Sequence, residues 1–185
     1  YWPKTETTPI LEMTAGDALR RAASLVPDRT ALVEIVPAGM SSLTGAATTD
    51  RRWTYGKLLA DAEACARWLL TRFSPGEHIC LWAPNVPEWI VLQYGAALAG
   101  LVIVTANPAL REAELTHVLR QSRSVGLITV ASYRGSDMAG IATGLGVEVR
   151  VVIVIEDLTR LVASARAEGP LPAVEPASPA QIQFT

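Results

Sequence analysis

Short apolar runs alternate along this chain with amphipathic segments of about a dozen residues, and this alternation constrains the fold more than any other feature. The runs are 78–83, 101–105, 125–130 and 149–155, and Arg150 is the one charged residue among them. Strands that are apolar on both faces are typical of parallel sheets, because helices cover both faces of such sheets. We therefore predict an α/β fold with a mostly parallel sheet flanked by helices.

Two helices are predicted near the amino end by their caps and periodicity. A capping box at Thr14 and Asp17 opens the first, and Pro27 ends it. Its expected apolar face is Ala18, Leu19, Ala22, Leu25 and Val26. Thr54 can cap the second, whose expected apolar face is Leu58, Ala62, Cys65, Ala66, Leu69 and Phe73.

Later helices follow the strands. We expect Asn85 to cap one of them, with Glu88 completing the cap, and an amphipathic helix to follow Asn107 and Pro108. That helix should bury residues at helical spacing, namely Leu115, Val118, Leu119 and Ser122. Weaker patterns predict helices over 136–144 and 157–167.

The remaining segments define the organisation of the chain. We expect residues 1–13 to be an extension and 14–167 to be one α/β subdomain, with strands 31–36 and 51–55 forming an N-terminal β-hairpin. Prolines mark 168–179 as an extended linker. A last strand is predicted over 180–185.

The uncharged run 89–110 is long enough to be tested as a membrane span. Gln93, Asn107 and Pro108 interrupt it, and Gly100 precedes β-branched residues. A buried helix that runs into a buried strand explains this pattern better.

The composition of the chain excludes several classes of protein. With 185 residues, half of them hydrophobic and 18% charged, the chain can bury a core of one domain. A net charge of −2 gives no basis for nucleic-acid binding. Two cysteines and an amino end without a signal-peptide pattern indicate a reducing, cytoplasmic location.

The candidate chemical groups form no complete site. His78 and Cys80 share a face of one strand and could be half a metal site or a Cys–His pair, but packed strand positions fit them better. His117 is expected at a helix surface, and Glu112 and Glu114 favour a helix start. We predict no catalytic residue and no metal ligand within the chain.

The segment from Trp82 to Asn85 ends a predicted parallel strand, at the edge where open α/β sheets bind ligands. A simpler interpretation is also open, in which Asn85 is only a helix cap and Trp89 only a core anchor.

Several pieces in order resemble one family. They are Trp53-Thr54-Tyr55, Gly76-Glu77 through Asn85-x-x-Glu88-Trp89, Asn107-Pro108-x-x-Arg111-x-x-Glu114-Leu115, and Gln181-Ile182-Gln183-Phe184-Thr185. As an ordered set they resemble the adenylate-forming (AMP-binding) superfamily and, within it, the fatty-acid–CoA ligases. Lys57 and Ser178 depart from residues that are common there.

The resemblance implies a two-step reaction of the whole enzyme. A fatty acid attacks the α-phosphate of ATP, and coenzyme A then displaces AMP from the acyl-adenylate, with Mg²⁺ assisting. By the same resemblance, Thr185 is the first residue of the ATP phosphate loop, and the other catalytic residues would lie downstream. We therefore expect this chain alone to be a truncated, inactive piece that binds no cofactor.

Other functions stay open. The chain could be a non-catalytic α/β module that binds a ligand or self-associates, or part of an adenylating domain for an aryl or amino acid. Peripheral membrane contact is also open, without a transmembrane segment. The residues do not define the acyl-chain length.

Overall fold

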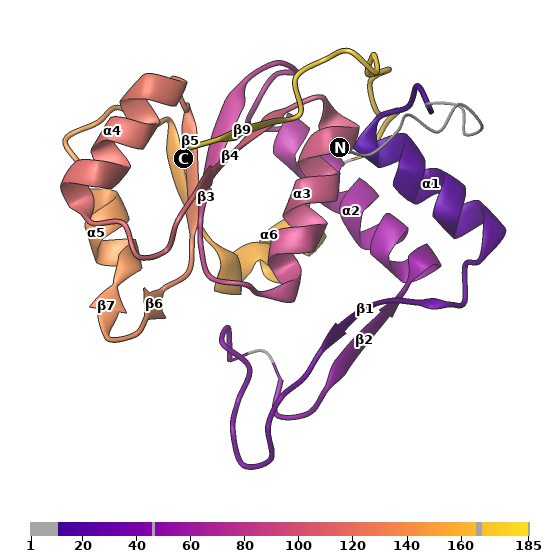
Figure 1. Ribbon diagram of the computed structural model, residues 1–185, viewed down its shortest axis with the longest axis horizontal. Coiled ribbons are helices and arrows are strands. Elements are labelled where there is room, and N and C mark those ends of the chain that lie inside the picture. Colours follow the sequence, from indigo (N-terminus) through magenta and orange to yellow (C-terminus); the bar gives the residue numbers. More distant parts are fainter. Residues whose placement is uncertain (1–10, 46, 166–167, 185) are drawn as a thin grey trace, which may run out of the picture.

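The computed structural model describes residues 11–45, 47–165 and 168–184 and centres on a five-stranded parallel sheet (Figure 1). The strand order is β8-β5-β3-β4-β9, and every neighbouring pair is parallel. The strands are β3 (His78–Trp82), β4 (Val102–Ala106), β5 (Gly126–Thr129), β8 (Val151–Val154) and β9 (Gln181–Gln183). The predicted α/β fold with a parallel sheet is confirmed.

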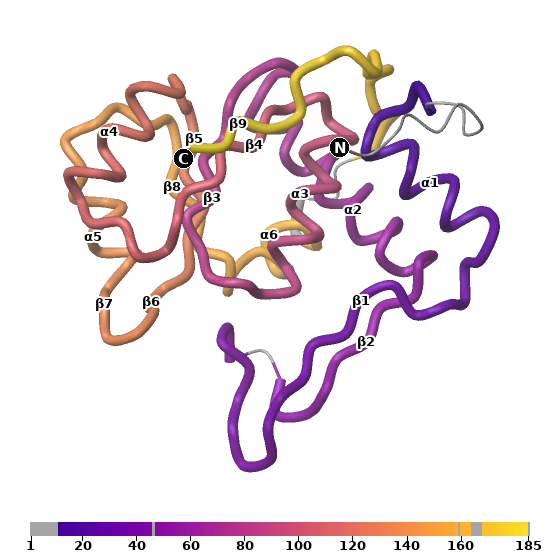
Figure 2. Tube along the Cα trace, in the orientation of Figure 1, coloured from indigo at the N-terminus to yellow at the C-terminus, as the bar shows by residue number. Residues whose placement is uncertain are grey.

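Helices cover both faces of this sheet, as the tube view also shows (Figure 2). One face carries α4 (Glu112–Ser122) and α5 (Met138–Gly144). The other carries α2 (Tyr55–Leu70), α3 (Pro87–Ala99) and α6 (Leu158–Ala165), the last preceded by the 3-10 turn η1 (Ile155–Asp157). An outer helix, α1 (Ala15–Leu25), packs against α2 and α3.

Two antiparallel hairpins lie outside the sheet. The first pairs β1 (Thr30–Glu34) with β2 (Arg51–Thr54), as predicted for the N-terminal hairpin. The second, β6 (Ser132–Tyr133) with β7 (Ser136–Asp137), was not predicted. Its turn residues Arg134 and Gly135 have φ of 50° and 80°, which suits the tight turn that joins such strands. Arg is a rare choice for the left-handed region, so the sequence signal was weak.

The core lies between the helices and the sheet. All six residues predicted for this apolar face are buried, although Phe73 follows the end of α2, and all four predicted for α4 are buried as well. Trp68 and Trp82 are among the largest fully buried side chains. The uncharged run 89–110 forms most of α3 and all of β4, which confirms its prediction as core. Within the described residues, no helix is both long enough and apolar enough to cross a membrane.

Two predicted details are wrong. The buried face of α1 is Gly16, Leu19 and Ala23, whereas Leu25 is exposed. A Cβ atom at Gly16 would lie 2.8 Å from Leu98 Cδ2, so α1 approaches α3 through its smallest residues.

The predicted cap of α3 is also wrong. Val86, not Asn85, is the N-cap residue, and it makes no side-chain cap hydrogen bond. Pro87 occupies the first turn, where its missing N–H leaves no donor unsatisfied. The helix therefore begins without the side-chain cap that the Asn85 prediction required.

Candidate functional site

The carboxyl ends of the parallel strands meet at one edge, and both hairpins project beyond that edge (Figure 1). In the sheet, β4 lies next to β3 on one side and β5 lies next to β3 on the other. The chain therefore leaves β3 in one direction along the sheet and later returns across it to form β5. The helices that follow the neighbouring strands β3 and β5 therefore lie on opposite faces (Figure 2). Open α/β sheets bind ligands in the crevice at such a point. This edge is the candidate site.

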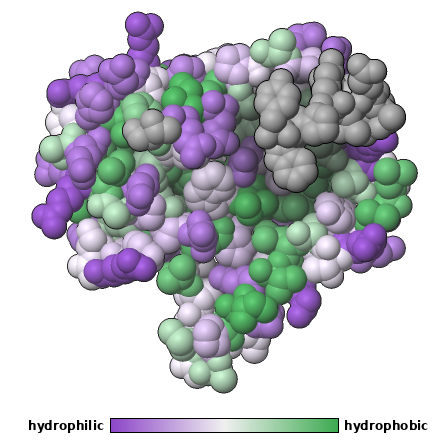
Figure 3. Space-filling view, in the orientation of Figure 1, coloured by the Kyte–Doolittle hydropathy of each residue, from purple (hydrophilic) through white to green (hydrophobic). Residues whose placement is uncertain are grey.

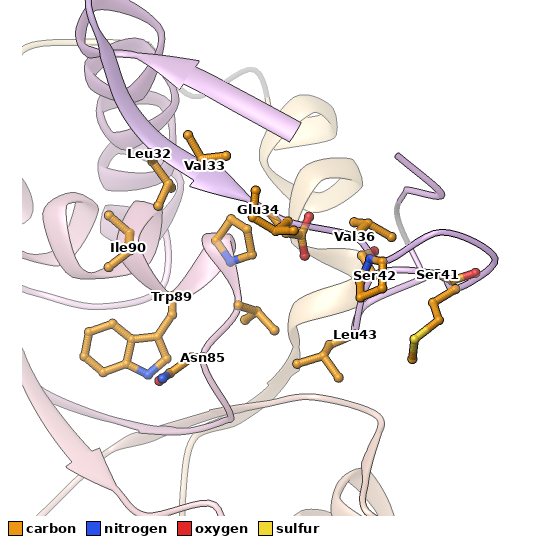
Figure 4. Close-up of a pocket in the computed structure, with 15 residues that line it drawn as sticks. Leu32, Val33, Glu34, Val36, Ser41, Ser42, Leu43, Asn85, Trp89 and Ile90 are labelled. Carbon is orange, nitrogen blue, oxygen red and sulfur yellow. The ribbon is translucent and has the colours of Figure 1, made fainter. Parts of the chain in front are cut away.

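A groove of about 660 Å³ opens at this edge between the first hairpin and the start of α3 (Figure 4). It has the size of a small-molecule site, for which about 300–1,000 Å³ is usual. Most of its lining is apolar, with a few polar groups. The lining residues are Leu32–Pro37, Met40–Leu43, Asn85–Pro87, Trp89 and Ile90.

A charged cluster fixes the hairpin against α3. Arg51 Nε donates to Glu34 Oε2 at 2.6 Å, and Arg51 Nη1 donates to Glu88 Oε1 at 2.7 Å. The exposed fractions of the three side chains are 22% for Arg51, 12% for Glu34 and 11% for Glu88. Burial opposes the charge on Arg51, but the hydrogen bonds to the two carboxylates outweigh it and raise its pKa. The cluster is therefore a partly desolvated anchor in which one guanidinium binds two carboxylates.

A second hollow, of about 550 Å³, lies beside the ends of β4 and β9. Trp82 Nε1 donates to the Asn107 carbonyl at 3.1 Å, which ties the end of β3 to the turn after β4. In that turn Asn107 Oδ1 accepts from the Ala109 amide at 2.9 Å. The hollow is lined by Thr105, Asn107, Leu110, Ala113, Glu114, His117, Val118 and Phe184.

The predicted site residue Thr185 lies outside the described residues. The strand before it is described: β9 pairs in parallel with β4, and Phe184 follows at the carboxyl edge, on the second hollow.

The other candidates are packed or at the surface. Cys80 is fully buried, and desolvation raises the pKa of its thiol to about 12, so it is no nucleophile at neutral pH. His78 Nδ1 lies 2.6 Å from the Ser122 carbonyl. His117 is exposed on the flank of α4.

The residues at the edge do not fit Mg²⁺ or a triphosphate by themselves. Within 11–45, 47–165 and 168–184, no three His, Cys, Asp or Glu side chains gather as metal ligands would. The Arg51 guanidinium already binds two carboxylates. A further charged pair, Glu77 with Arg150, lies at the opposite, amino end of β3. A nucleotide site at this edge therefore needs groups other than these.

Sequence reasoning missed the Arg51 cluster and both hollows. Glu34 and Arg51 lie opposite each other in the hairpin. Aligning the two predicted strands residue by residue could therefore have predicted this ion pair. Glu88 comes from a distant helix and was assigned to a cap.

Together, the sheet order and the hollowed carboxyl edge define an open α/β domain, a class whose ligands usually bind at this edge. A family model described as "AMP-binding enzyme" matches residues 19–185. The chain belongs to this family of AMP-binding enzymes.

Named relatives agree with that membership. "Putative acyl-CoA synthetase YngI" of Bacillus subtilis (strain 168) is 31% identical over 139 residues, covering 74% of this chain and 23% of that protein. The mitochondrial medium-chain acyl-CoA ligase ACSF2 of Pongo abelii is 32% identical over 109 residues, covering 58% of this chain and 16% of the ligase. This chain thus spans less than a quarter of either relative.

Among solved structures, the N-terminal domain of FACL13 from Mycobacterium tuberculosis superimposes with a TM-score of 0.77 at 27% identity. The match covers 94% of this chain and 42% of that one. The arrangement of the sheet and its flanking helices is therefore the one found in that experimentally determined domain.

Proposed function

We propose that this chain is the amino-terminal part of an ATP-dependent fatty-acid–CoA ligase. The whole enzyme would join a fatty acid and coenzyme A through an acyl-adenylate, releasing AMP and pyrophosphate. The observation that carries the proposal is the family match over residues 19–185 together with the path of β9. That strand runs beside β4 and delivers Phe184 to the carboxyl edge, where Thr185 would begin the phosphate loop.

In this proposal the chain supplies scaffold, and no chemical step is assigned to its described residues. Magnesium and the triphosphate would be held by the loop that starts at Thr185 and by groups contributed from elsewhere in the enzyme. Preorganised donors around the transferring group supply most of the catalysis in such reactions. The described residues position the strand that carries this loop.

A cytoplasmic location is part of the proposal. Cys65 and Cys80 are both free and buried, in agreement with a reducing compartment.

The gene itself provides the first test. We expect the reading frame to continue after Thr185 into Ser-Gly-Thr-Thr-Gly or a close variant. A stop codon directly after Thr185 would favour the non-catalytic module instead.

Activity provides the second test. The protein encoded by the whole frame should form acyl-CoA from a fatty acid, ATP·Mg²⁺ and coenzyme A, whereas the 185-residue chain should form none. Calorimetry should detect no binding of ATP·Mg²⁺ to this chain. Micromolar binding, or acyl-CoA made by the chain alone, would refute the scaffold role. Pyrophosphate release that depends on an amino or aryl acid would instead identify the other adenylating class.

A further inference from the structure

The segment that leads into β9 is held against the body of the molecule, although its described residues, 168–180, form no helix or strand. We call this segment the strap. It passes the carboxyl-terminal end of α3 on its way to β9 (Figure 1). Arg67 Nε of α2 donates to the Gly169 carbonyl at 3.1 Å, and Leu171 is half-buried against the core. The first half of the strap is therefore attached to the body at two points.

Val174 is the third attachment point of the strap. It packs over Gly100, the C-cap residue of α3, where a Cβ atom would lie 3.4 Å from Val174 Cγ2. Gly100 closely precedes Val102, the first residue of β4. Val174 is thus anchored to the stretch of chain that leads into β4, and β4 is the strand with which β9 pairs.

The rest of the strap is exposed and stiff. Residues 175–180 are exposed, and Figure 3 shows paler and more hydrophilic residues along the upper edge, where the strap runs in Figure 1, than at the centre of the molecule. The Ser178 amide donates to the Glu175 carbonyl at 2.9 Å, which closes a turn. Pro176 and Pro179 restrict the backbone further. The path from Val174 to β9 is therefore fixed by local structure.

The strand β9 defines its own register only weakly. It pairs with β4 through three residues, Gln181–Gln183, and no other described strand pairs with it. Ala180, Ile182 and Phe184 alternate with the two glutamines, so all three point to one face. A slip by two residues would keep an apolar side chain on that face, although it would move the strand by about 7 Å.

We propose that the strap sets the register of β9 and thereby positions the phosphate loop, with Val174 as the positioning residue. This rests on the proposed function, since Thr185 is taken as the first residue of that loop. Val174 holds one end of the fixed path, and at the other end the Ala180 carbonyl accepts from the Ile103 amide at 3.1 Å. A misplacement of about 1 Å can cost a reaction about a hundredfold in rate. A two-residue slip is several times larger, so the loop needs this anchor.

Disulfide cross-linking of the 185-residue chain measures the register directly. Thr105 and Gln183 are register partners, so Thr105→Cys with Gln183→Cys should form a disulfide on oxidation. Thr105→Cys with Gln181→Cys should form none, because those positions lie about 8 Å apart, beyond the roughly 7 Å that a disulfide can bridge. With Val174→Gly added, both pairs should cross-link. The native cysteines are buried and should not compete.

Two matched variants separate the anchor from the flexibility of the strap. Ala177→Gly frees the backbone as Val174→Gly does, but it keeps the contact with Gly100. Val174→Ile keeps a branched apolar side chain at that contact. Both should retain the single register of the parent chain. The inference is overturned if Val174→Gly also retains it, or if Ala177→Gly loses it to the same extent.

Kinetics of the enzyme encoded by the whole frame test the consequence for the reaction. Val174→Gly should lower kcat/KM for ATP at least about tenfold, because the phosphate loop acts in the first step. It should leave kcat/KM for coenzyme A unchanged, since coenzyme A enters after pyrophosphate has left. Val174→Ile and Ala177→Gly should behave like the parent enzyme.

The outcomes distinguish the anchor from the proposed function. A merely structural role of Val174 would reduce the amount of folded enzyme, and with it kcat/KM for both substrates equally, which would overturn the positioning role. A parent enzyme that forms no acyl-CoA would refute the proposed function instead. The cross-links would then still decide whether the strap sets the register of β9.

Discussion

Replacing Arg51 by methionine should destabilise the chain far more than removing an exposed ion pair. The substitution leaves Glu34 and Glu88 facing the same space, both nearly buried and without their shared cation. Breaking a buried pair by removing one partner costs about 3–5 kcal/mol. Because Arg51 is still 22% exposed, we expect a smaller cost than this, about 2–4 kcal/mol. For a chain of this size, that lowers Tm by about 4–16 °C.

Urea denaturation followed by tryptophan fluorescence measures this loss as a change in the free energy of unfolding. Lys57→Met is the matched control, because Lys57 pairs with Asp61 at 3.0 Å but is 57% exposed. It should cost under about 1 kcal/mol. Adding Glu34→Gln and Glu88→Gln to the Arg51→Met variant should recover part of the loss. Equal, small effects of Arg51→Met and Lys57→Met would refute the role of the cluster.

Three further outcomes follow from local geometry. Gly126→Ala should cost about 1–3 kcal/mol in urea denaturation, because its Cβ would lie 2.6 Å from Phe73 Cζ; no loss would mean that the ring moves freely. Glu77 binds Arg150, which holds the pKa of its carboxyl below the ordinary 4.5. That stabilisation is present above pH 4.5 and is lost as the pH falls through the lower folded value, so Glu77→Gln should flatten acid unfolding curves. Thr14→Ala should cost about 1 kcal/mol, because the hydroxyl accepts a first-turn amide of α1; an unchanged Tm would contradict this.

The fold could be predicted where periodicity and burial act together. In α2 the five predicted residues that lie within the helix are all buried, because many apolar residues repeat at helical spacing. In α1 the same reasoning failed, since the helix turns its smallest residues toward α3 and leaves Leu25 outside. Size, rather than hydrophobicity, decides how closely two helices approach.

The candidate site was harder to predict because its groups meet only in three dimensions. Arg51 and Glu88 are far apart along the chain, and neither belongs to a local motif. The groove likewise depends on the angle at which the hairpin leaves the body (Figure 4). The end of β3 at the carboxyl edge of a parallel sheet was predicted correctly, because parallel topology fixes where every strand ends.

The place of β9 in the sheet affects the order in which the molecule can fold. Ile103 of β4 pairs with Gln181 of β9, although almost the whole second half of the chain separates them. By contrast, β3, α3 and β4 follow one another directly and can form early, because short loops close at lower entropic cost. Until β9 is synthesised, β4 keeps one edge unpaired and open to strands of other chains. Residues up to Gln183 must therefore leave the ribosome before β4 is paired on both sides, and the short β9 then becomes the edge strand.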